Sequence, residues 1–208
     1  STCPNAAAYE EEGATTVNDA STAVGDTVVV TTSGAALNVG DIISFSTTAA
    51  TNDYDDGEQY RITNISTNDI TIVQHPRGTG GLKRALTDGS NIRRRWKYYD
   101  AVDGAPGTST YVSERNGAND EIHVVVIDED GGISGVPGTI LETFSKLSKA
   151  SDAKDPQGND NYYPNVIYTK SEYIYWTKHH ASGSNWGNAA SGTTFTAVNT
   201  PTLETMSG

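Results

Sequence analysis

The sequence has few of the features that cross-link a protein chain or anchor it in a membrane. Cys3 is the only cysteine among 208 residues, so no disulfide bond can form within the chain. No run of about 18 apolar residues is present, which excludes a transmembrane helix. Hydrophobic residues make up only 35% of the chain and aromatic residues 8%. The fold must therefore be stabilised by packing or by assembly.

Neither an initiator methionine nor a signal peptide is found at Ser1. The chain starts abruptly with STCPN and ends abruptly with LETMSG. We therefore expect it to be a fragment of a longer protein. Its length is sufficient for one large domain or two small ones.

Basic residues are scarce. The chain has 14 Lys and Arg against 26 Asp and Glu, a net charge of −12, and residues 1–80 contain only Arg61 and Arg77 as bases. A negative charge of this size opposes general attraction to nucleic acids and to anionic membranes. We expect no nucleic-acid partner and no membrane partner.

Short β-branched runs separated by Gly, Asn and Asp begin after residue 24. The strand candidates are Thr27–Thr31, Asp41–Ser46, Gln59–Ile65 and Asp69–Gln74. Their short, regular spacing is typical of a small antiparallel β-sandwich or barrel. We predict a β module over residues 21–82, preceded by a leading segment, residues 1–20, that forms a weak helical turn or an acidic loop. The glycine-rich residues 78–81 would form a hinge after the module.

The clearest core element lies in residues 119–150. Ile122–Ile127 is a β-branched run that suits a strand buried on both faces, and a glycine-rich turn follows it. Thr139 and Glu142 have the spacing of a helix capping box. The apolar residues behind them recur at helical intervals: Ile140, Leu141, Phe144, Leu147 and Ala150. We predict a strand, a turn and an amphipathic helix, with Lys146 and Lys149 on the exposed helix face.

Residues 83–208 are accordingly expected to form an α/β core domain with an extended tail, which makes the whole chain a mixed α/β protein. Additional strands are predicted at Arg93–Tyr99, Asn165–Tyr168 and Ser171–Trp176. From His179 onward Gly, Ser, Thr and Asn dominate, which predicts a poorly anchored tail.

The acidic turn at Asp128, Glu129 and Asp130 is the first candidate metal site. An EF-hand loop needs an oxygen ligand at its fifth position and glycine at its sixth, whereas this sequence has Gly132 and Ile133 there. The twelfth position is Thr139 rather than glutamate. The turn is better interpreted as a solvated strand end.

The four histidines, His75, His123, His179 and His180, have no zinc-ligand spacing. No serine lies in a GxSxG context, and the glycines match neither phosphate-binding fingerprint. We predict no catalytic, cofactor-binding or metal-binding residues, no cofactor and no enzymatic activity.

The run Arg93–Tyr99 (RRRWKYY) alternates bases and aromatic residues, as a strand that binds nucleic acid does. The acidity of the chain opposes this interpretation. A half-buried strand whose arginines meet carboxylates, or ion pairing between copies of the chain, explains the pattern as well.

Four sequence blocks resemble a known family. They are IRRRWKYYDAVDGAPGTSTY, NDEIHVVVIDEDGGISGVPGTILETFSKLSKASDAK, GNDNYYPNVI and SEYIYW, which together span residues 92–176. As an ordered series they resemble the contractile tail sheath proteins of myovirus phages, most nearly those of phages that infect marine cyanobacteria. The resemblance implies that this region is an α/β sheath core, the subtilisin-like domain without a protease triad. Residues 21–82 would then resemble the outer β-sandwich domain inserted nearby.

The resemblance also implies a function. The chain would be the middle fragment of a structural subunit that assembles helically around the tail tube and contracts to drive it through the host envelope for genome ejection. Its partners would be neighbouring sheath subunits, the tail tube protein, the baseplate and the tail terminator. It would be located in the virion tail, after assembly in the bacterial host cytoplasm. Heterologous contacts that do not close produce such a helical tube, and rigid domains that shift between two states allow contraction.

The alternative from another class is a glycan-binding β-module of a phage or surface protein. Its aromatic platform would consist of Tyr162, Tyr163, Tyr173, Tyr175 and Trp176. A platform predicts that these side chains are exposed together, whereas a sheath subunit predicts that most are buried. A hydrolase that uses the subtilisin-like core has the weakest support, because no triad can be assembled from motifs.

Overall fold

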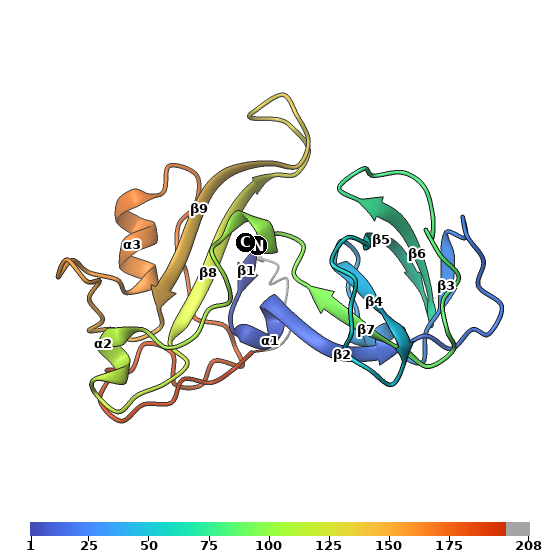
Figure 1. Cartoon of the computed structure of the whole chain (residues 1–208). Helices are drawn as coiled ribbons and strands as arrows, with labels where there is room; N and C mark the ends of the chain where they lie inside the picture. Colours follow the sequence, from blue (N-terminus) through green and yellow to red (C-terminus); the bar gives the residue numbers. More distant parts are fainter. Residues whose placement is uncertain (199–208) are drawn as a thin grey trace. The chain divides into compact units, whose positions relative to one another are not determined.

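The computed structural model describes residues 1–198 and shows a β-rich protein (Figure 1). The described residues form nine strands in two antiparallel sheets, together with a few short helices. The chain divides into two compact units. Glu10–Lys97 form one, and Ser1–Tyr9 join the residues from Tyr98 onward in the other. The first unit is therefore inserted into the sequence of the second.

The inserted unit is a six-stranded antiparallel barrel. Its strands, in spatial order, are β2 (Glu10–Thr16), β7 (Ser90–Arg95), β4 (Ile42–Ala49), β5 (Gln59–Ser66), β6 (Asp69–His75) and β3 (Val28–Val30). The two outer strands meet just beyond β2, where Val17 and Thr31 form an antiparallel bridge. The amide of Asn18 donates to the carbonyl of Val30 at 2.9 Å and strengthens this bridge. The sheet thus closes on itself, which removes the open edges that a flat sheet exposes.

The interior of the barrel follows from alternation along the strands. The buried residues alternate with less buried ones along part of each strand, as Tyr60 and Ile62 do on β5 and Ile70 and Ile72 on β6. The buried cluster consists of Val17, Val29, Leu37, Ile43, Phe45, Tyr60, Ile62, Ile70, Ile72, Leu82, Leu86 and Ile92. Burial of each large apolar side chain contributes about 1.5–3 kcal/mol to folding.

The four strands predicted between residues 27 and 74 are confirmed as β3, β4, β5 and β6. Strand β2 was not predicted, since its sequence EEEGATT was interpreted as a helical turn or a loop. It forms because Glu10 and Glu11 lie opposite Arg95 and Arg94 of β7, and opposite charges in cross-strand positions stabilise the pairing. The short helix α1 (Ala6–Tyr9) ends directly before it. The barrel unit consequently extends beyond residues 21–82 at both ends.

The other unit is organised around the predicted strand Ile122–Ile127, which is confirmed as β8 (Glu121–Asp128). Strand β8 lies between β1 (Thr2–Cys3) and β9 (Thr139–Ser148) in a three-stranded antiparallel sheet. Six of its eight residues are buried, as expected for a central strand. Helix α3 (Tyr163–Lys170) contributes Val166 and Ile167 to the same hydrophobic core. The remaining short elements are α2 (Thr110–Ser113) and the 3₁₀ turns Gly34–Ala36 and Tyr99–Ala101.

The amphipathic helix predicted from Thr139 is wrong, because these residues form strand β9. The turn decides this outcome. The Asp128 carboxylate accepts hydrogen bonds from the amides of Ile133 and Ser134 at 3.0 and 2.6 Å, and the Gly138 amide donates to the Asp128 carbonyl at 2.7 Å. The turn closed in this way returns the chain antiparallel to β8 as a long hairpin (Figure 1).

The predicted face of that helix is also corrected. Phe144 is only half-buried and Ile140 is exposed, while Lys146 is exposed as expected. Lys149, which was placed on the exposed face, is completely buried. A register shift next to His123 and a positive φ of 53° at Lys146 interrupt the strand alternation before Lys149.

Two further strand predictions in this unit are wrong. Asn165–Tyr168 lies inside helix α3, where Pro164 occupies the first turn and suits a helix start. Ser171–Trp176 belongs to no strand. The tail from His179 is irregular but anchored as far as residue 198, since Trp186, Phe195 and Val198 are core residues. Its last ten residues lie outside the described part of the chain.

No helix in the described part of the chain is long and apolar enough to cross a membrane.

Candidate functional site

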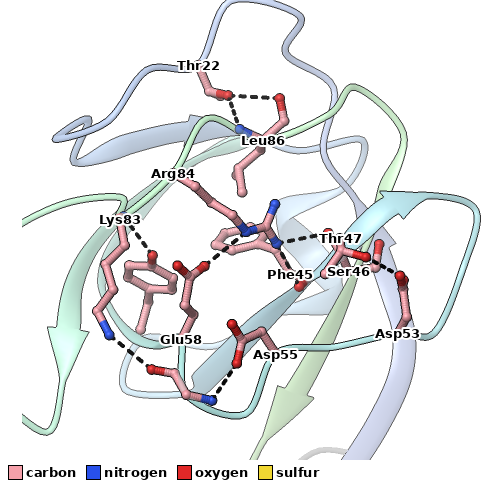
Figure 2. Close-up of polar contacts among 12 residues, drawn as sticks. Thr22, Phe45, Ser46, Thr47, Asp53, Asp55, Glu58, Lys83, Arg84 and Leu86 are labelled. Atoms are coloured by element: carbon pink, nitrogen blue, oxygen red, sulfur yellow. Dashed lines mark hydrogen bonds and ion pairs between the residues drawn. The ribbon is translucent and has the colours of Figure 1, made fainter.

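The acidic loop of the barrel, residues 52–58, connects β4 to β5 and is held in place by Arg84 (Figure 2). The Arg84 guanidinium donates from Nε to Glu58 at 3.0 Å. Its Nη2 donates to the carbonyls of Phe45 and Ser46 at 3.2 and 3.1 Å. One cation therefore fastens the end of the loop to strand β4.

Further hydrogen bonds in Figure 2 fix the backbone of the loop. Lys83 donates from Nζ to the carbonyl of Gly57 at 2.9 Å, and the Gly57 amide donates to the Asp55 carboxylate at 2.8 Å. The Thr47 hydroxyl donates to Asp53. These bonds leave little freedom to the loop, so its carboxylates occupy defined positions.

The arginines of β7 pair with carboxylates inside the barrel unit. Arg93 forms an ion pair with Asp56, and Arg95 reaches the same carboxylate at 3.3 Å as well as Glu10. Arg94 lies 3.1 Å from Glu11. The interpretation of this run as a strand whose arginines meet carboxylates is confirmed for Arg93–Arg95, but the predicted strand Arg93–Tyr99 ends at Arg95.

The electrostatic consequence is that the ionised forms of Asp53 and Asp56 are stabilised. Hydrogen bonds from the hydroxyls of Thr47 and Thr51 lower the pKa of Asp53. Partial desolvation works to raise the pKa of Asp56, but its bonds to Arg93 and Arg95 outweigh this effect and lower it. Asp53, Asp55 and Asp56 are all exposed, so the loop presents hydrogen-bond acceptors and negative charge to solvent.

The second candidate site is an aromatic cluster in the unit built on β8. Trp176 Nε1, which can only donate, bonds to the Tyr163 hydroxyl at 3.1 Å. The Tyr163 hydroxyl lies 2.7 Å from His179 Nδ1, and Tyr162 lies 3.3 Å from His179 Nε2. The Tyr163 oxygen accepts from Trp176, and the direction of its bond to His179 Nδ1 is set by the tautomer of His179.

Burial tunes the titration of this cluster. It raises the pKa of Tyr163 to about 12 and lowers the pKa of His179. Both groups are therefore neutral around pH 7, which preserves the hydrogen bonds among Trp176, Tyr163 and His179.

The five aromatic residues predicted as a platform divide into two sets. Tyr163 is buried and Tyr162 half-buried, whereas Tyr173, Tyr175 and Trp176 are 43%, 76% and 38% exposed. The set is therefore neither exposed together nor mostly buried. The exposed members lie on one segment, residues 168–178, which we call the aromatic segment.

A third polar group lies beneath the surface of the same unit. Lys149 Nζ donates to the carbonyls of Pro4 and Asn119 at 2.6 and 2.9 Å and lies 5.0 Å from the Trp186 ring centroid. Burial lowers the pKa of Lys149 to about 8. Cation–π contact and two carbonyl acceptors partly offset the cost of burying this charge.

Asp120 and His123 complete the buried polar group. The Asp120 carboxylate accepts hydrogen bonds from the Ser109 amide at 2.8 Å and from the Ser148 hydroxyl. His123 Nδ1 accepts from the Lys146 amide at 2.9 Å, so Nε2 donates to the Gly104 carbonyl at 3.0 Å. Burial lowers the pKa of His123. All of these side chains except Lys146 and Ser109 are buried, so a substrate cannot reach them.

In the described part of the chain, neither the acidic turn nor the histidines form a metal-binding group. Asp128 organises the β8–β9 turn, while Glu129 and Asp130 are exposed beside it. His180 Nδ1 accepts from the Ser182 amide at 3.1 Å. Within residues 1–198, no group of three or more His, Cys, Asp or Glu side chains is arranged to hold a metal ion.

Sequence reasoning did not find Lys149, Asp120 or Arg84. A lysine within an apolar run was the only signal for Lys149, and the helical interpretation placed that lysine in solvent. Nothing in the local sequence indicates that Arg84 meets Glu58, because the two lie 26 positions apart.

Comparison of the chain with protein-family models, with curated proteins and with solved structures finds no match.

Proposed function

We propose that the chain is the middle part of a structural subunit of a contractile phage tail sheath, similar to the sheath proteins of cyanophages. The observation that carries the proposal is the ordered series of four sequence blocks over residues 92–176. Two of these blocks contribute to a single hydrophobic core, through β8, β9 and α3, and Tyr111 and Ile174 of the other two blocks pack against it. A shared core is the property expected of blocks that belong to one domain.

In this proposal, the unit built on β8, β9 and α3 belongs to the subtilisin-like α/β domain of the sheath, which has no protease triad. The barrel is its inserted outer β domain. The insertion of Glu10–Lys97 between two segments of the other unit supports this assignment, because the resemblance implies an inserted β domain.

We propose no catalysed reaction. The polar side chains with the strongest resemblance to catalytic groups, Asp120, His123 and Lys149, are completely buried. Their hydrogen bonds fix the Pro4 and Asn119 carbonyls and the Ser148 hydroxyl, which is a structural role.

The partners in this proposal are neighbouring sheath subunits, the tail tube protein, the baseplate and the tail terminator. The negatively charged barrel would lie on the outside of the tube. The subunit would slide and rotate as a rigid body during contraction.

Electron microscopy of the parent particle tests the proposal. Antibodies raised against this chain are expected to label a helical tube around the tail along its whole length. Labelling confined to fibres, to the capsid or to the tail tip would contradict it.

A second candidate is a glycan-binding module, favoured by the exposure of Tyr173, Tyr175 and Trp176. Aromatic faces that are open to solvent stack on sugar rings. Titration of host surface polysaccharide against the chain is expected to change tyrosine and tryptophan fluorescence in this case. The Tyr175→Ala variant would lose the change, whereas the Tyr98→Ala variant would retain it.

A further inference from the structure

We propose that the aromatic segment of one copy of this chain binds the acidic loop of the barrel of a second copy. This inference deepens the proposed sheath function, since it names the surfaces through which neighbouring subunits meet.

The exposed aromatic side chains of the described residues all lie on the aromatic segment. They are Tyr168, Tyr173, Tyr175 and Trp176, with exposed fractions of 74%, 43%, 76% and 38%. Tyrosine and tryptophan are enriched in protein interfaces and dominate their binding energy. Their collection within nine residues therefore indicates a contact surface.

The aromatic segment is held in shape before it meets a partner. The Glu142 carboxylate of β9 accepts from the Ser171 hydroxyl at 2.6 Å and from the Glu172 amide at 2.8 Å. Ile174 packs on the hydrophobic core, and Trp176 is bonded to Tyr163. Tyr173 and Tyr175, on either side of Ile174, consequently point to solvent. A surface ordered in advance loses little conformational entropy on binding.

The chemistry of the aromatic segment suits an anionic partner. The hydroxyls of Tyr173 and Tyr175 are exposed hydrogen-bond donors, and neither has a protein acceptor within residues 1–198. The segment has two lysines, Lys170 and Lys178, against one acid, Glu172, and all three residues are exposed, so its formal charge is positive. Phenol and ammonium donors form strong hydrogen bonds with carboxylates.

The acidic loop has the complementary chemistry. It presents the exposed carboxylates of Asp53, Asp55 and Asp56, whose remaining lone pairs can only accept. Arg84 and Lys83 hold the loop to the barrel wall, as Figure 2 shows, so it is also ordered in advance. A second copy is the partner that always carries this loop.

Two different surfaces on the same chain give a heterologous contact. Such a contact repeats from subunit to subunit and generates an open helical assembly unless the rotation closes a ring. The open assembly is the geometry that a sheath requires.

A sugar fits the aromatic segment less well. The indole N–H of Trp176 is already bonded to Tyr163, and its ring lies against Tyr163 and His179 at centroid distances of 6.5 and 5.0 Å. The largest aromatic face of the segment is therefore partly used inside the molecule.

The test uses two variants of the full chain, each with one surface altered. The aromatic variant carries Tyr173→Ser and Tyr175→Ser. The loop variant carries Asp53→Asn and Asp55→Asn, each of which keeps one acceptor oxygen, for Thr47 or Thr51 at position 53 and for the Gly57 amide at position 55. Sedimentation velocity is measured over a range of concentrations, for each variant alone and for the mixture. The control variant Ile133→Ser, Val136→Ser removes two other exposed apolar side chains of the same unit, and thermal melts verify that every variant is folded.

We expect the unaltered chain and the control to associate progressively as concentration rises. Each altered variant alone should associate about 30-fold more weakly, the factor that corresponds to loss of an interface hot spot. The mixture should form a one-to-one pair and nothing larger, because each pair uses the one intact surface of each member.

Three results would overturn the inference. The first is absence of association of the unaltered chain, and the second is association of either variant with unaltered strength. The third is binding of host polysaccharide that requires Tyr173 and Tyr175 while sedimentation stays that of a monomer, which would assign the segment to a sugar. If antibodies label a tube around the tail but the variants associate as strongly as the unaltered chain, the sheath function stands and only this contact is rejected. Pairing of the mixture without any tube in the particle would reject the sheath function and keep the contact.

Discussion

The hydroxyl of Tyr9 donates a hydrogen bond to the carbonyl of Tyr99 at 3.1 Å, across 90 positions of sequence. The two rings also meet edge to face at 6.3 Å, and the Tyr9 ring lies 6.4 Å from that of His123. Tyr9 is the last residue before the barrel unit, and Tyr99 follows it closely. The two chain segments that lead into and out of the barrel unit are thus held together within the unit built on β8.

This arrangement predicts that the barrel can be removed. Deletion of Glu10–Lys97 with a short glycine–serine linker should leave the β8 unit folded, because the ends of the insertion are already close together. A cooperative thermal melt and a retained near-UV circular dichroism signal are the expected results. By contrast, deletion of residues 21–82 should not give a cooperatively folded protein, because β2 and β7 would lack the strands that close the barrel. Loss of the melt in the first deletion would show that the unit needs the barrel.

Lys146 provides a prediction about backbone strain. Its φ of 53° lies in the left-handed region, which costs about 1–2 kcal/mol for a residue with a side chain. The Lys146→Gly variant should therefore raise the free energy of unfolding by about 1 kcal/mol in urea denaturation. Lys146→Ala keeps the strain and serves as the control, with an expected change near zero. Equal effects of the two variants would contradict this account of the bulge in β9.

The buried Lys149 predicts an unusual dependence of stability on pH. Below pH 8 both the folded and the unfolded chain hold the proton, and folding carries the full cost of burying the ammonium. Between about 8 and the ordinary value of 10.5 the unfolded chain holds more protons than the folded chain, so the free energy of unfolding rises with pH. The complete shift corresponds to roughly 3 kcal/mol.

Denaturation measured from pH 8 to about 9.5, below the ordinary tyrosine pKa near 10, follows this rise. The Lys149→Met variant should lose it, whereas the exposed-lysine control Lys154→Met should retain it. A stability that falls over this interval in the unaltered chain, and equally in Lys149→Met, would contradict the assignment.

The contacts of Arg84 lead to a prediction about the stability of the barrel and its acidic loop. Its replacement in Arg84→Met removes donors to Glu58 and to two backbone carbonyls, so the free energy of unfolding should fall by about 2 kcal/mol. Arg77→Met, at an exposed position, should change it by less than about 0.5 kcal/mol. Proteolysis should also cleave the loop faster in Arg84→Met. Unchanged stability and unchanged cleavage would show that the loop does not depend on this cation.

The sequence by itself determined four of the six barrel strands, β3 to β6, and strand β8. In Ile62, Ile70 and Ile72 the alternation of apolar and polar residues matches only one local structure, a strand with one buried face. The β-branched run of β8 likewise has no helical alternative that buries it as well. The apolar segment carrying Tyr173, Tyr175 and Trp176 could also be selected from sequence, although its exposure could not.

Only the tertiary structure decided the rest. Residues 139–148 satisfy a helical period, yet the Asp128 turn brings them beside β8, and the hydrogen bonds of the hairpin outweigh a local preference worth tenths of a kcal/mol per residue. Strand β2 has no apolar pattern and exists because Glu10 and Glu11 meet arginines more than 80 positions away. Lys149 is buried because Pro4 and Asn119 offer it carbonyls from distant segments. For β2 and Lys149 the partners that supply the stabilising energy are far away in sequence, so no local pattern contains them.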